Sequence, residues 1–463
     1  MSWRQRVVAG LLVALAALVA ASSGLPMLVP DLARGPPRAV PLVGAGGPLS
    51  AAQSRAVLAR LAAAGGPPTD IFTRHLALEE AVTGSPLTTG NAVVLLQDGP
   101  ATYRAMLAAI VAARQHIHLE TYILDDDEVG QRFAQALIDK RRQGVAVRLI
   151  RDSVGTLGTP AAFFERMAEA GVQVLEFNPA NPLAARKDWD LNQRDHRKLL
   201  VVDGHIAFLG GINISSVYSG GSFGTGSRAR QAAGDPWRDT DLQLKGPVVA
   251  ELQKMFLATW AAQKGPVLEE RGHFPPLQRA GTLVVRAIAS TPDEDFSQIY
   301  ATLLSAIGSA ETSVQITNAY FVPDPQLLQA LMDAAARGVD VRLILPSKTD
   351  SGLALAAGRS HYESLLRAGV KIHEMHGAVL HAKAVLVDGV WATIGSTNLD
   401  WRSFLHNHEL NSVVLGMEFG RRMQAMFARD LAASEEVLLP AWLQRPWHQR
   451  LREQFARAWE YWL

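Results

Sequence analysis

Hydrophobic and polar residues follow one another along the chain in short blocks that predict strands and helices in regular succession. Apolar runs at 92–96, 116–124 and 145–151 alternate with amphipathic stretches at 101–115 and 129–143. Apolar runs of this length predict buried strands, and the amphipathic stretches between them predict helices. This alternation is typical of an α/β sheet with helices packed on its faces.

The same order of predicted elements returns in the second half of the chain. Strands are predicted at 283–288, 312–320 and 339–344, and helices at 296–310 and 327–337. Matching sequences accompany the repeated elements: 144–150 with 338–344, 122–123 with 320–321, and 170–172 with 368–370. A single match is expected between any two α/β segments, but several matches in the same order predict an internal duplication.

The segments outside this repeat predict a domain order. Residues 30–48 are rich in Pro and Gly and predict a flexible linker. Two predicted helices at 49–64 and 71–82 complete a linker and helical preface that spans 30–90. The two predicted halves are then 91–265 and 277–440, with a second linker between them. A Gly-, Ser- and Arg-rich stretch at 219–236 has no counterpart in the second half, and we expect a mobile loop near the first site.

The first 29 residues have the composition of a targeting segment. Arg4 and Arg6 precede an uncharged apolar run at 7–21, which small residues follow. About 15 residues match the apolar core of a signal peptide and are short for a membrane span, which needs roughly 20. Inclusion of 25–29 makes the run long enough for a retained anchor, so both interpretations stay open. In either case the basic flank stays inside, and we expect a membrane-associated protein whose catalytic body is exported.

The C-terminal segment, 441–463, predicts an amphipathic helix. Its large apolar residues recur at spacings of four, four, four and three: Trp447, Leu451, Phe455, Trp459 and Trp462. Arginines lie elsewhere around the same helix. An aromatic stripe with arginines suits a membrane interface, and the alternative is that the stripe packs against the catalytic body.

Composition and charge narrow the classes of function. With 463 residues, 48% hydrophobic and 19% charged, the chain is long enough for two or three folded domains. A formal net charge of +1 gives no indication of a nucleic-acid partner. Because the chain has no cysteine, disulfides, thiolate catalysis and zinc–thiolate sites are excluded.

The candidate chemistry lies in a pattern that occurs twice, H-x-K-x4-D-x6-G-[GS]-x-N. The first copy contains His196, Lys198, Asp203, Gly211 and Asn213, and the second contains His381, Lys383, Asp388, Ser396 and Asn398. A lone H-x-K motif occurs by chance in many proteins. Two long copies with the same spacing and no insertion are not expected by chance.

Each copy presents groups that suit a phosphate. Positions i and i+2 of a strand point to the same face, so His196 and Lys198 project together, as do His381 and Lys383. The Asp-Gly pair after each strand predicts a tight turn. The small residues of G-[GS]-x-N let backbone amides approach a ligand, and the Asn adds a donor.

Two copies that meet about a pseudo-twofold axis would place two His and two Lys around one phosphate. One neutral His can attack phosphorus while the other, protonated, serves as acid and then as base. The lysines offset the charge of the equatorial oxygens, so no metal or cofactor is required. A carboxylate should hold the far nitrogen of each ring; Asp239 and Glu409 are the candidates, and Asp241 could replace Asp239. The alternative for each is a carboxylate at a surface or strand end.

The doubled motif resembles the signature of the phospholipase D superfamily. Residues 195–204, 320–324 and 395–404 make it similar to bacterial cardiolipin synthases of the phospholipase D type, over about 91–439. The resemblance implies a duplicated phospholipase D-type α/β sandwich, with two pseudo-twofold related halves, one shared active site and a phosphohistidine intermediate. It also implies transfer of a phosphatidyl group between two phosphatidylglycerol molecules, with release of glycerol, at a membrane surface.

The resemblance assigns roles to the motif residues. It implies His196 as nucleophile and His381 as general acid, with Asp203 and Asp388 mainly structural. Family members often carry two N-terminal membrane helices, and this sequence predicts at most one. Hydrolysis of phospholipids to phosphatidic acid is the main alternative. A nuclease is disfavoured by the near-neutral charge, and a non-catalytic scaffold by the intact motifs.

Overall fold

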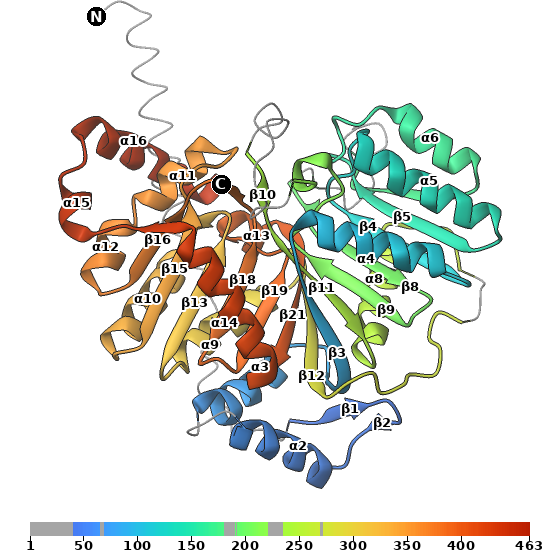
Figure 1. The fold of residues 1–463 in the computed structure, drawn as a ribbon, viewed down its shortest axis with the longest axis horizontal. Coiled ribbons are helices and arrows are strands. Elements are labelled where there is room, and N and C mark those ends of the chain that lie inside the picture. The colour runs from blue at the N-terminus through green and yellow to red at the C-terminus, as the bar shows by residue number, and fades with distance from the viewer. Residues whose placement is uncertain (1–39, 65–68, 180–189, 191, 221–234, 269–271) are drawn as a thin grey trace, which may run out of the picture.

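The two predicted halves lie side by side in the computed structural model and share one sheet. The structure describes residues 40–64, 69–179, 190, 192–220, 235–268 and 272–463. In Figure 1 the first half is cyan to green and the second half is yellow to red, and strands β3 and β12 run next to each other between them. The predicted N-terminal signal or anchor (1–29) and most of the predicted loop at 219–236 lie outside the described residues.

The strands of the first half pair in the order β6-β5-β4-β8-β9-β11-β3. β4, β5 and β6 run parallel, and the remaining neighbours are antiparallel. The bounds are β3 Leu87–Gln97, β4 His116–Thr121, β5 Ala146–Asp152, β6 Gln173–Phe177, β8 Leu199–Val202, β9 Ile206–Gly210 and β11 Thr240–Lys245.

The second half repeats this order as β16-β15-β13-β18-β19-β21-β12. Its bounds are β12 Leu283–Ser290, β13 Ser313–Asn318, β15 Asp340–Pro346, β16 Lys371–Met375, β18 Lys383–Val387, β19 Trp391–Gly395 and β21 Asn407–Leu415. A further edge strand, β22 (Ser434–Glu436), pairs with β16. Antiparallel pairing of β3 with β12 joins the halves, so the predicted duplicated α/β fold is confirmed.

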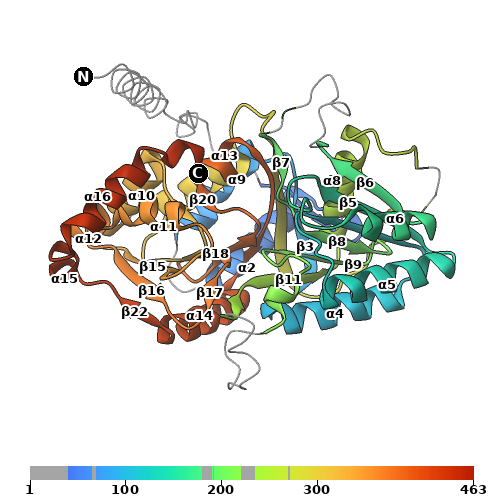
Figure 2. The same ribbon diagram turned by 90° about the horizontal axis from the view of Figure 1, so that it is seen from above.

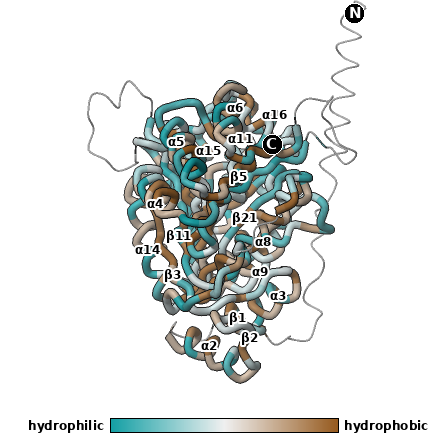
Figure 3. Tube along the Cα trace, turned by 90° about the vertical axis from the view of Figure 1, so that its right-hand side faces the viewer, coloured by the Kyte–Doolittle hydropathy of each residue, from teal (hydrophilic) through white to brown (hydrophobic). Residues whose placement is uncertain are grey.

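Helices cover the outer faces of both halves. In the first half these are α4 (Asp98–Ala112), α5 (Glu128–Arg142), α6 (Ala161–Glu169) and α8 (Val248–Ala262). In the second half they are α9 (Gln298–Gly308), α10 (Pro325–Ala336), α11 (Gly352–Arg359), α12 (Tyr362–Arg367) and α14 (Met417–Ala432). In Figure 3 hydrophobic residues gather along inner strands such as β11, whereas the outer helix α5 is largely hydrophilic.

One hydrophobic core spans the boundary between the halves. It joins strand residues such as Leu199 and Leu242 of the first half to Leu386 and Val414 of the second, together with Phe256 of α8. All of these side chains are buried. Separate cores lie under the outer helices of each half. Burial of the shared core makes the relative position of the halves, and hence of their motifs, a property of the fold.

The N-terminal preface packs against the core of the second half and pairs with a strand of the first. It contains β1 (Leu42–Gly44), β2 (Gly47–Pro48), α2 (Ala51–Ala64), a π-helical turn (Ile71–His75) and α3 (Leu76–Val82). Residues 42–48 differ from the flexible linker that their Gly and Pro content predicts, because β1 pairs with β3. Glu79 is buried and accepts hydrogen bonds from Trp391 and His75, each at 3.0 Å, beside the Arg286 guanidinium at 2.9 Å.

Short elements complete the chain. Near the seam these are β7 (Arg194–Asp195), β10 (Trp237–Arg238), β14 (Phe321–Val322), β17 (Val379–Leu380), β20 (Leu399–Asp400) and α13 (Trp401–Leu405). The C-terminal segment forms α15 (Leu439–Leu443), α16 (Trp447–Arg457) and a 3₁₀ turn (Glu460–Trp462). Within the described part of the chain, no helix has the length and apolar character needed to cross a membrane.

Candidate active site

Each motif histidine is fixed by hydrogen bonds to the backbone of the opposite half. The His196 N–H donates to the His408 carbonyl at 3.0 Å, where β7 pairs with the start of β21. The His381 N–H donates to the Arg238 carbonyl at 2.8 Å, where β10 pairs with β17. Both histidines stand just before their strands, since β8 begins at Leu199 and β18 at Lys383. These two crossed ladders bring the motifs together at the seam.

The two histidines line one cavity of about 300 Å³. His196 is 9% exposed and His381 is 6% exposed, so both rings are largely shielded from solvent. Aromatic side chains form much of the wall: Tyr122, Tyr218, Trp237 and Tyr320. The cavity is therefore a single site to which both halves contribute.

The carboxylate that holds each histidine comes from the other half of the chain. Glu409 lies 3.0 Å from His196 Nδ1, and Asp239 lies 2.7 Å from His381 Nδ1. An Nδ1–H that donates to a carboxylate leaves the Nε2 lone pair free. The sequence left open whether Asp239 or Asp241 holds His381, and the structure places Asp239 there. The Asp241 carboxylate instead accepts a hydrogen bond from the Ile212 N–H at 3.1 Å.

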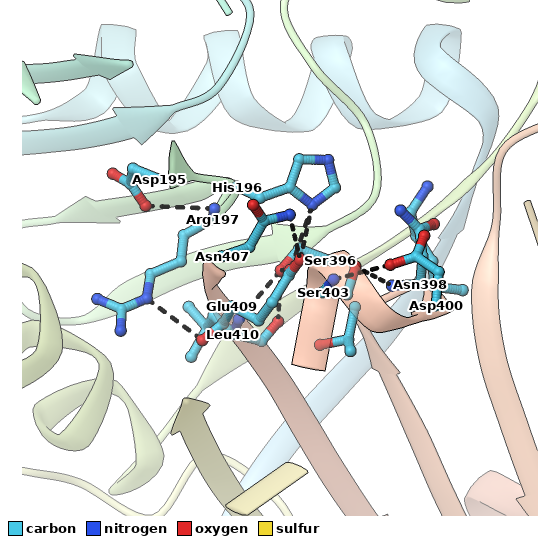
Figure 4. A network of polar contacts seen from close by, with 12 residues as sticks. Asp195, His196, Arg197, Ser396, Asn398, Asp400, Ser403, Asn407, Glu409 and Leu410 are labelled. Carbon is cyan, nitrogen blue, oxygen red and sulfur yellow. Dashed lines mark hydrogen bonds and ion pairs between the residues drawn. The ribbon is translucent and has the colours of Figure 1, made fainter. Parts of the chain in front are cut away.

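Neighbouring residues hold these carboxylates differently in the two halves. The Ser396 hydroxyl and the Asn407 amide donate to Glu409, as Figure 4 shows. At the equivalent position Gly211 leaves room for Asp239, because a Cβ there would lie 2.3 Å from Asp239 Oδ1. The sequence suggested that Gly211 and Ser396 support a bound phosphate. The structure places both against the carboxylates that orient the histidines.

The two motif asparagines also differ. Asn213 uses its whole amide inside the protein, since it accepts from the Ile123 N–H at 3.2 Å and donates to Tyr218 Oη at 3.0 Å. Tyr218 Oη in turn lies 3.3 Å from His381 Nδ1. Asn398 lines the cavity as well, but its buried amide oxygen has no partner among the described residues. The fold therefore leaves the amide oxygen of Asn398 unpaired, whereas it fixes that of Asn213.

The motif lysines are buried beside their histidines. Lys198 Nζ donates to the His196 carbonyl at 2.6 Å, and Lys383 Nζ lies 3.1 Å from His381 Nε2. Burial, opposed by the carboxylates of Glu409 and Asp239, lowers the pKa of Lys198 to about 7 and that of Lys383 to about 8. A negatively charged ligand in the cavity would favour the protonated form of both lysines.

Burial also favours neutral imidazoles in the free protein. Desolvation, followed by the charge of the adjacent lysine, lowers the pKa of His196 and of His381 to about 4, although the paired carboxylates oppose this shift. Burial raises the pKa of Glu409, but the charge and hydrogen bond of His196 outweigh it and lower that pKa to about 2. At neutral pH the free protein therefore presents unprotonated histidines next to an ionised Glu409.

The motif aspartates lie away from the cavity and hold its scaffold. Asp203 accepts hydrogen bonds from three consecutive backbone N–H groups, 114–116, at 2.8, 2.8 and 2.9 Å. Asp388 accepts from the equivalent groups at 311–313. Both occupy positive φ, 52° and 51°, in the predicted Asp-Gly turns. These contacts make Asp203 and Asp388 structural supports of β4 and β13, the strands that pair with the motif strands β8 and β18.

We expect Asp203→Ala and Asp388→Ala each to lower the free energy of unfolding by about 2–4 kcal/mol. Each substitution leaves several N–H groups without an acceptor and places alanine at positive φ. Urea denaturation of the purified variants measures the effect, with Asp333→Ala on exposed α10 as a control that should change stability by under about 0.5 kcal/mol. Loss of turnover at unchanged stability would instead indicate a direct part in the chemistry.

The sequence did not single out several residues that line the cavity. Tyr122 and Tyr320 both line the cavity and occupy equivalent positions in the two halves. The match between 122–123 and 320–321 in the sequence could have identified them as site residues. Burial raises the pKa of Asp400 to about 7, and Asp400 lines the cavity as well. Tyr218 has no counterpart in the second half, where Ser403 stands five residues after the motif asparagine. No repeat signal could therefore identify Tyr218.

Comparisons with known proteins agree with this geometry. The family model described as "Cardiolipin synthase, PLD-like domain" matches residues 106–219 and 303–431. A cardiolipin synthase of Geobacillus kaustophilus is 35% identical over 80% of this chain and 72% of its own length. Cardiolipin synthase 2 of Bacillus anthracis is 36% identical over 77% of this chain and 68% of its own.

A solved structure supports the fold independently of close sequence similarity. The phosphatidylserine synthase of Haemophilus influenzae Rd KW20 superposes with a TM-score of 0.58 at 14% identity, over 82% of this chain and 96% of that one. The shared fold, the family model across both halves and the identity to cardiolipin synthases all point the same way. The chain therefore belongs to the phospholipase D superfamily, in which it is an enzyme homologous to the cardiolipin synthases.

Proposed function

We propose that the protein is a phosphatidyltransferase that makes cardiolipin from two phosphatidylglycerol molecules through a phosphohistidine intermediate. The observation that carries this proposal is the pair of histidines in one cavity, each oriented by a carboxylate from the opposite half. A double displacement at phosphorus needs a nucleophile on one side and an acid–base group on the other. His196 and His381 supply these two functions.

In the first step His196 Nε2 attacks phosphorus of a bound phosphatidylglycerol. The bond between phosphorus and the glycerol oxygen breaks, and this oxygen takes a proton from His381. Free glycerol leaves, and the phosphatidyl group stays on His196. The negative charge of the arriving phosphodiester favours the protonated form of His381 that this step requires.

In the second step a glycerol hydroxyl of another phosphatidylglycerol attacks the phosphohistidine. His381 now accepts the hydroxyl proton, the bond from phosphorus to Nε2 breaks, and cardiolipin forms. Asn398 and Asn407 also stand in the cavity wall, where their side-chain amides can hydrogen-bond a polyol headgroup. Throughout, Lys198 and Lys383 offset the charge on the oxygens around phosphorus.

The lysines predict an alkaline limit to activity. The charge of Lys198 is lost as pH rises through about 7, and that of Lys383 through about 8. Because the cations offset the charge of the incoming phosphate, we expect kcat/KM to begin to fall at a pH of about 7 and to fall further above about 8. Measurement of kcat/KM as a function of pH at constant ionic strength tests this expectation, with enzyme stability checked at each pH. A flat profile between pH of about 6 and 10 would exclude a required ammonium charge in the free enzyme.

We further propose that the catalytic body is exported and acts at a phospholipid surface. The basic residues and apolar run at 4–21 support export, by a cleaved signal or by a retained anchor. Protease treatment of spheroplasts tests this proposal, because a body exported to the periplasm or the outer face is digested and a cytoplasmic one is protected. Mass spectrometry of the mature N-terminus then distinguishes cleavage from retention.

Analysis of the products tests the proposed reaction. Purified enzyme is incubated with vesicles of phosphatidylglycerol labelled in the acyl chains, and the lipids are separated. Cardiolipin with an equal amount of free glycerol is the expected outcome. Phosphatidic acid as the sole product would make the protein a hydrolase, and absence of any lipid turnover would overturn the lipid assignment. Parallel assays with a radiolabelled oligonucleotide test the disfavoured nuclease function.

A further inference from the structure

The C-terminal helix α16 presents a row of large apolar side chains to solvent. Trp447, Leu451 and Phe455 are 72%, 59% and 65% exposed, and Trp462 in the following turn is 51% exposed. Residues four apart lie on one face of a helix, so the first three form a continuous stripe. The alternative considered from the sequence, in which this stripe packs against the catalytic body, is therefore wrong for these residues.

The opposite face of α16 attaches the helix to the second half. Ala456 is fully buried in a small cluster with Val322 and with alanines of α11. Glu453 is also buried and pairs with Arg445 at 2.8 Å. Figure 1 shows α16 beside α11 at the upper left. The stripe is thus held outward by a packed helix.

The charges of α16 make its outer surface cationic. Arg450, Arg452 and Arg457 are exposed, whereas Glu453, the one acidic residue of the helix, is on the buried face. On a helical wheel the arginines flank the apolar stripe on both sides. Aromatic and aliphatic residues between arginines fit the boundary between the acyl chains and the headgroups of an anionic bilayer.

Segments next to α16 line the catalytic cavity. The chain leaves α16 through the 3₁₀ turn and reaches Leu463, which lines the catalytic cavity. Ala354 of α11, which packs under α16, lines the same cavity. In Figure 2 α16 and the C-terminus lie on the same side of the second half. A bilayer in contact with α16 and the 3₁₀ turn would consequently lie on the part of the second half that carries these cavity-lining residues.

We propose that α16 and the 3₁₀ turn dock the second half on an anionic phospholipid bilayer, with Trp447, Leu451, Phe455 and Trp462 in the interfacial layer. The choice of a bilayer over a protein partner rests on the proposed function, because the substrate is itself an anionic bilayer lipid. The docked helix brings the cavity to the membrane, so a lipid headgroup can enter without leaving the surface.

A single fluorescent label tests the contact directly, because the natural sequence has no cysteine. Leu451→Cys carries a polarity-sensitive fluorophore, and Val111→Cys on α4, where Val111 is 67% exposed, is the matched control. Both full-length proteins are mixed with phosphatidylcholine vesicles that contain phosphatidylglycerol and acyl-chain quenchers. We expect a blue shift and quenching for the label at 451, and neither at 111.

Two outcomes would overturn the docking proposal. In the first, the enzyme co-sediments with the vesicles but the label at 451 shows neither a blue shift nor quenching. In the second, the label at 451 is already shielded from water in the absence of lipid. The second outcome would mean that another part of this chain or a second copy covers the stripe. Neither readout requires turnover, so failure of the proposed reaction remains distinguishable.

The functional consequence is tested by a triple variant, Trp447→Gln with Leu451→Gln and Phe455→Gln. We expect its rate on phosphatidylglycerol vesicles to fall roughly tenfold or more, because loss of three apolar side chains weakens interfacial binding. Its rate on short-chain phosphatidylglycerol dissolved as monomers should stay within about twofold of the unaltered enzyme. Val111→Gln with Leu157→Gln and Val267→Gln, at other exposed apolar positions, is the control for general surface change. Equal losses on both substrates would contradict docking by α16.

Discussion

Replacement of either His196 or His381 by alanine is expected to lower turnover of phosphatidylglycerol by at least roughly 10⁴-fold. The first substitution removes the proposed nucleophile, and the second removes the proposed acid–base group. Because both rings line one cavity, neither half can work without the other. The double variant should lose little more activity than either single variant, as is usual for residues that act as a unit.

Steady-state assays with thermal denaturation of each variant measure this expectation. His376→Ala, at an exposed position in the second half, serves as a control that should leave the rate unchanged. If each motif were an independent site, either single substitution would leave about half of the activity and only the double variant would be inactive. Retention of near-normal rates by either single variant would contradict the shared site.

Neutralisation of the orienting carboxylates, Glu409→Gln and Asp239→Asn, is expected to lower kcat by about 10²–10⁴-fold. Each carboxylate accepts a hydrogen bond from Nδ1–H of the histidine from the other half and so fixes the tautomer. An amide keeps the size of the side chain but can donate to Nδ1 and favour the wrong tautomer. It also removes the negative charge that stabilises a protonated imidazole.

Asp241→Asn is a matched control for Asp239→Asn, because Asp241 is buried two residues away and accepts from the Ile212 N–H. Its effect on kcat should be smaller than that of Asp239→Asn at equal stability. Determination of kcat, KM and melting temperature for all three variants separates orientation from folding. Full activity of Glu409→Gln would mean that His196 needs no carboxylate to act.

Much of the fold could be predicted from local sequence pattern. The apolar run at 145–151 and the amphipathic stretch at 129–143 correspond to β5 and α5 to within a residue or two. These predictions succeed because burial imposes a different hydrophobic pattern on a strand between two neighbours than on a helix packed against a sheet. Contacts of the preface could not be predicted in this way, since Glu79 is held by Arg286 and Trp391, far away in the sequence.

In the candidate site, too, local features could be predicted from the sequence and long-range contacts could not. The doubled motif identified His196 and His381, whose spacing to Lys198 and Lys383 is local. It could not indicate that Glu409 orients the histidine of the other half, because that contact depends on the crossed pairing of β7 with β21. Nor could it assign Gly211, whose importance is the space it leaves for Asp239. Tertiary geometry decides both.

One shared site should form one covalent intermediate per chain. Rapid quenching of the enzyme with labelled phosphatidylglycerol, followed by peptide mass spectrometry, counts the phosphatidyl groups on each chain and locates them. We predict at most one group per chain, on the peptide that contains His196, and none in His196→Ala. Two groups per chain, one on His196 and one on His381, would contradict the shared site.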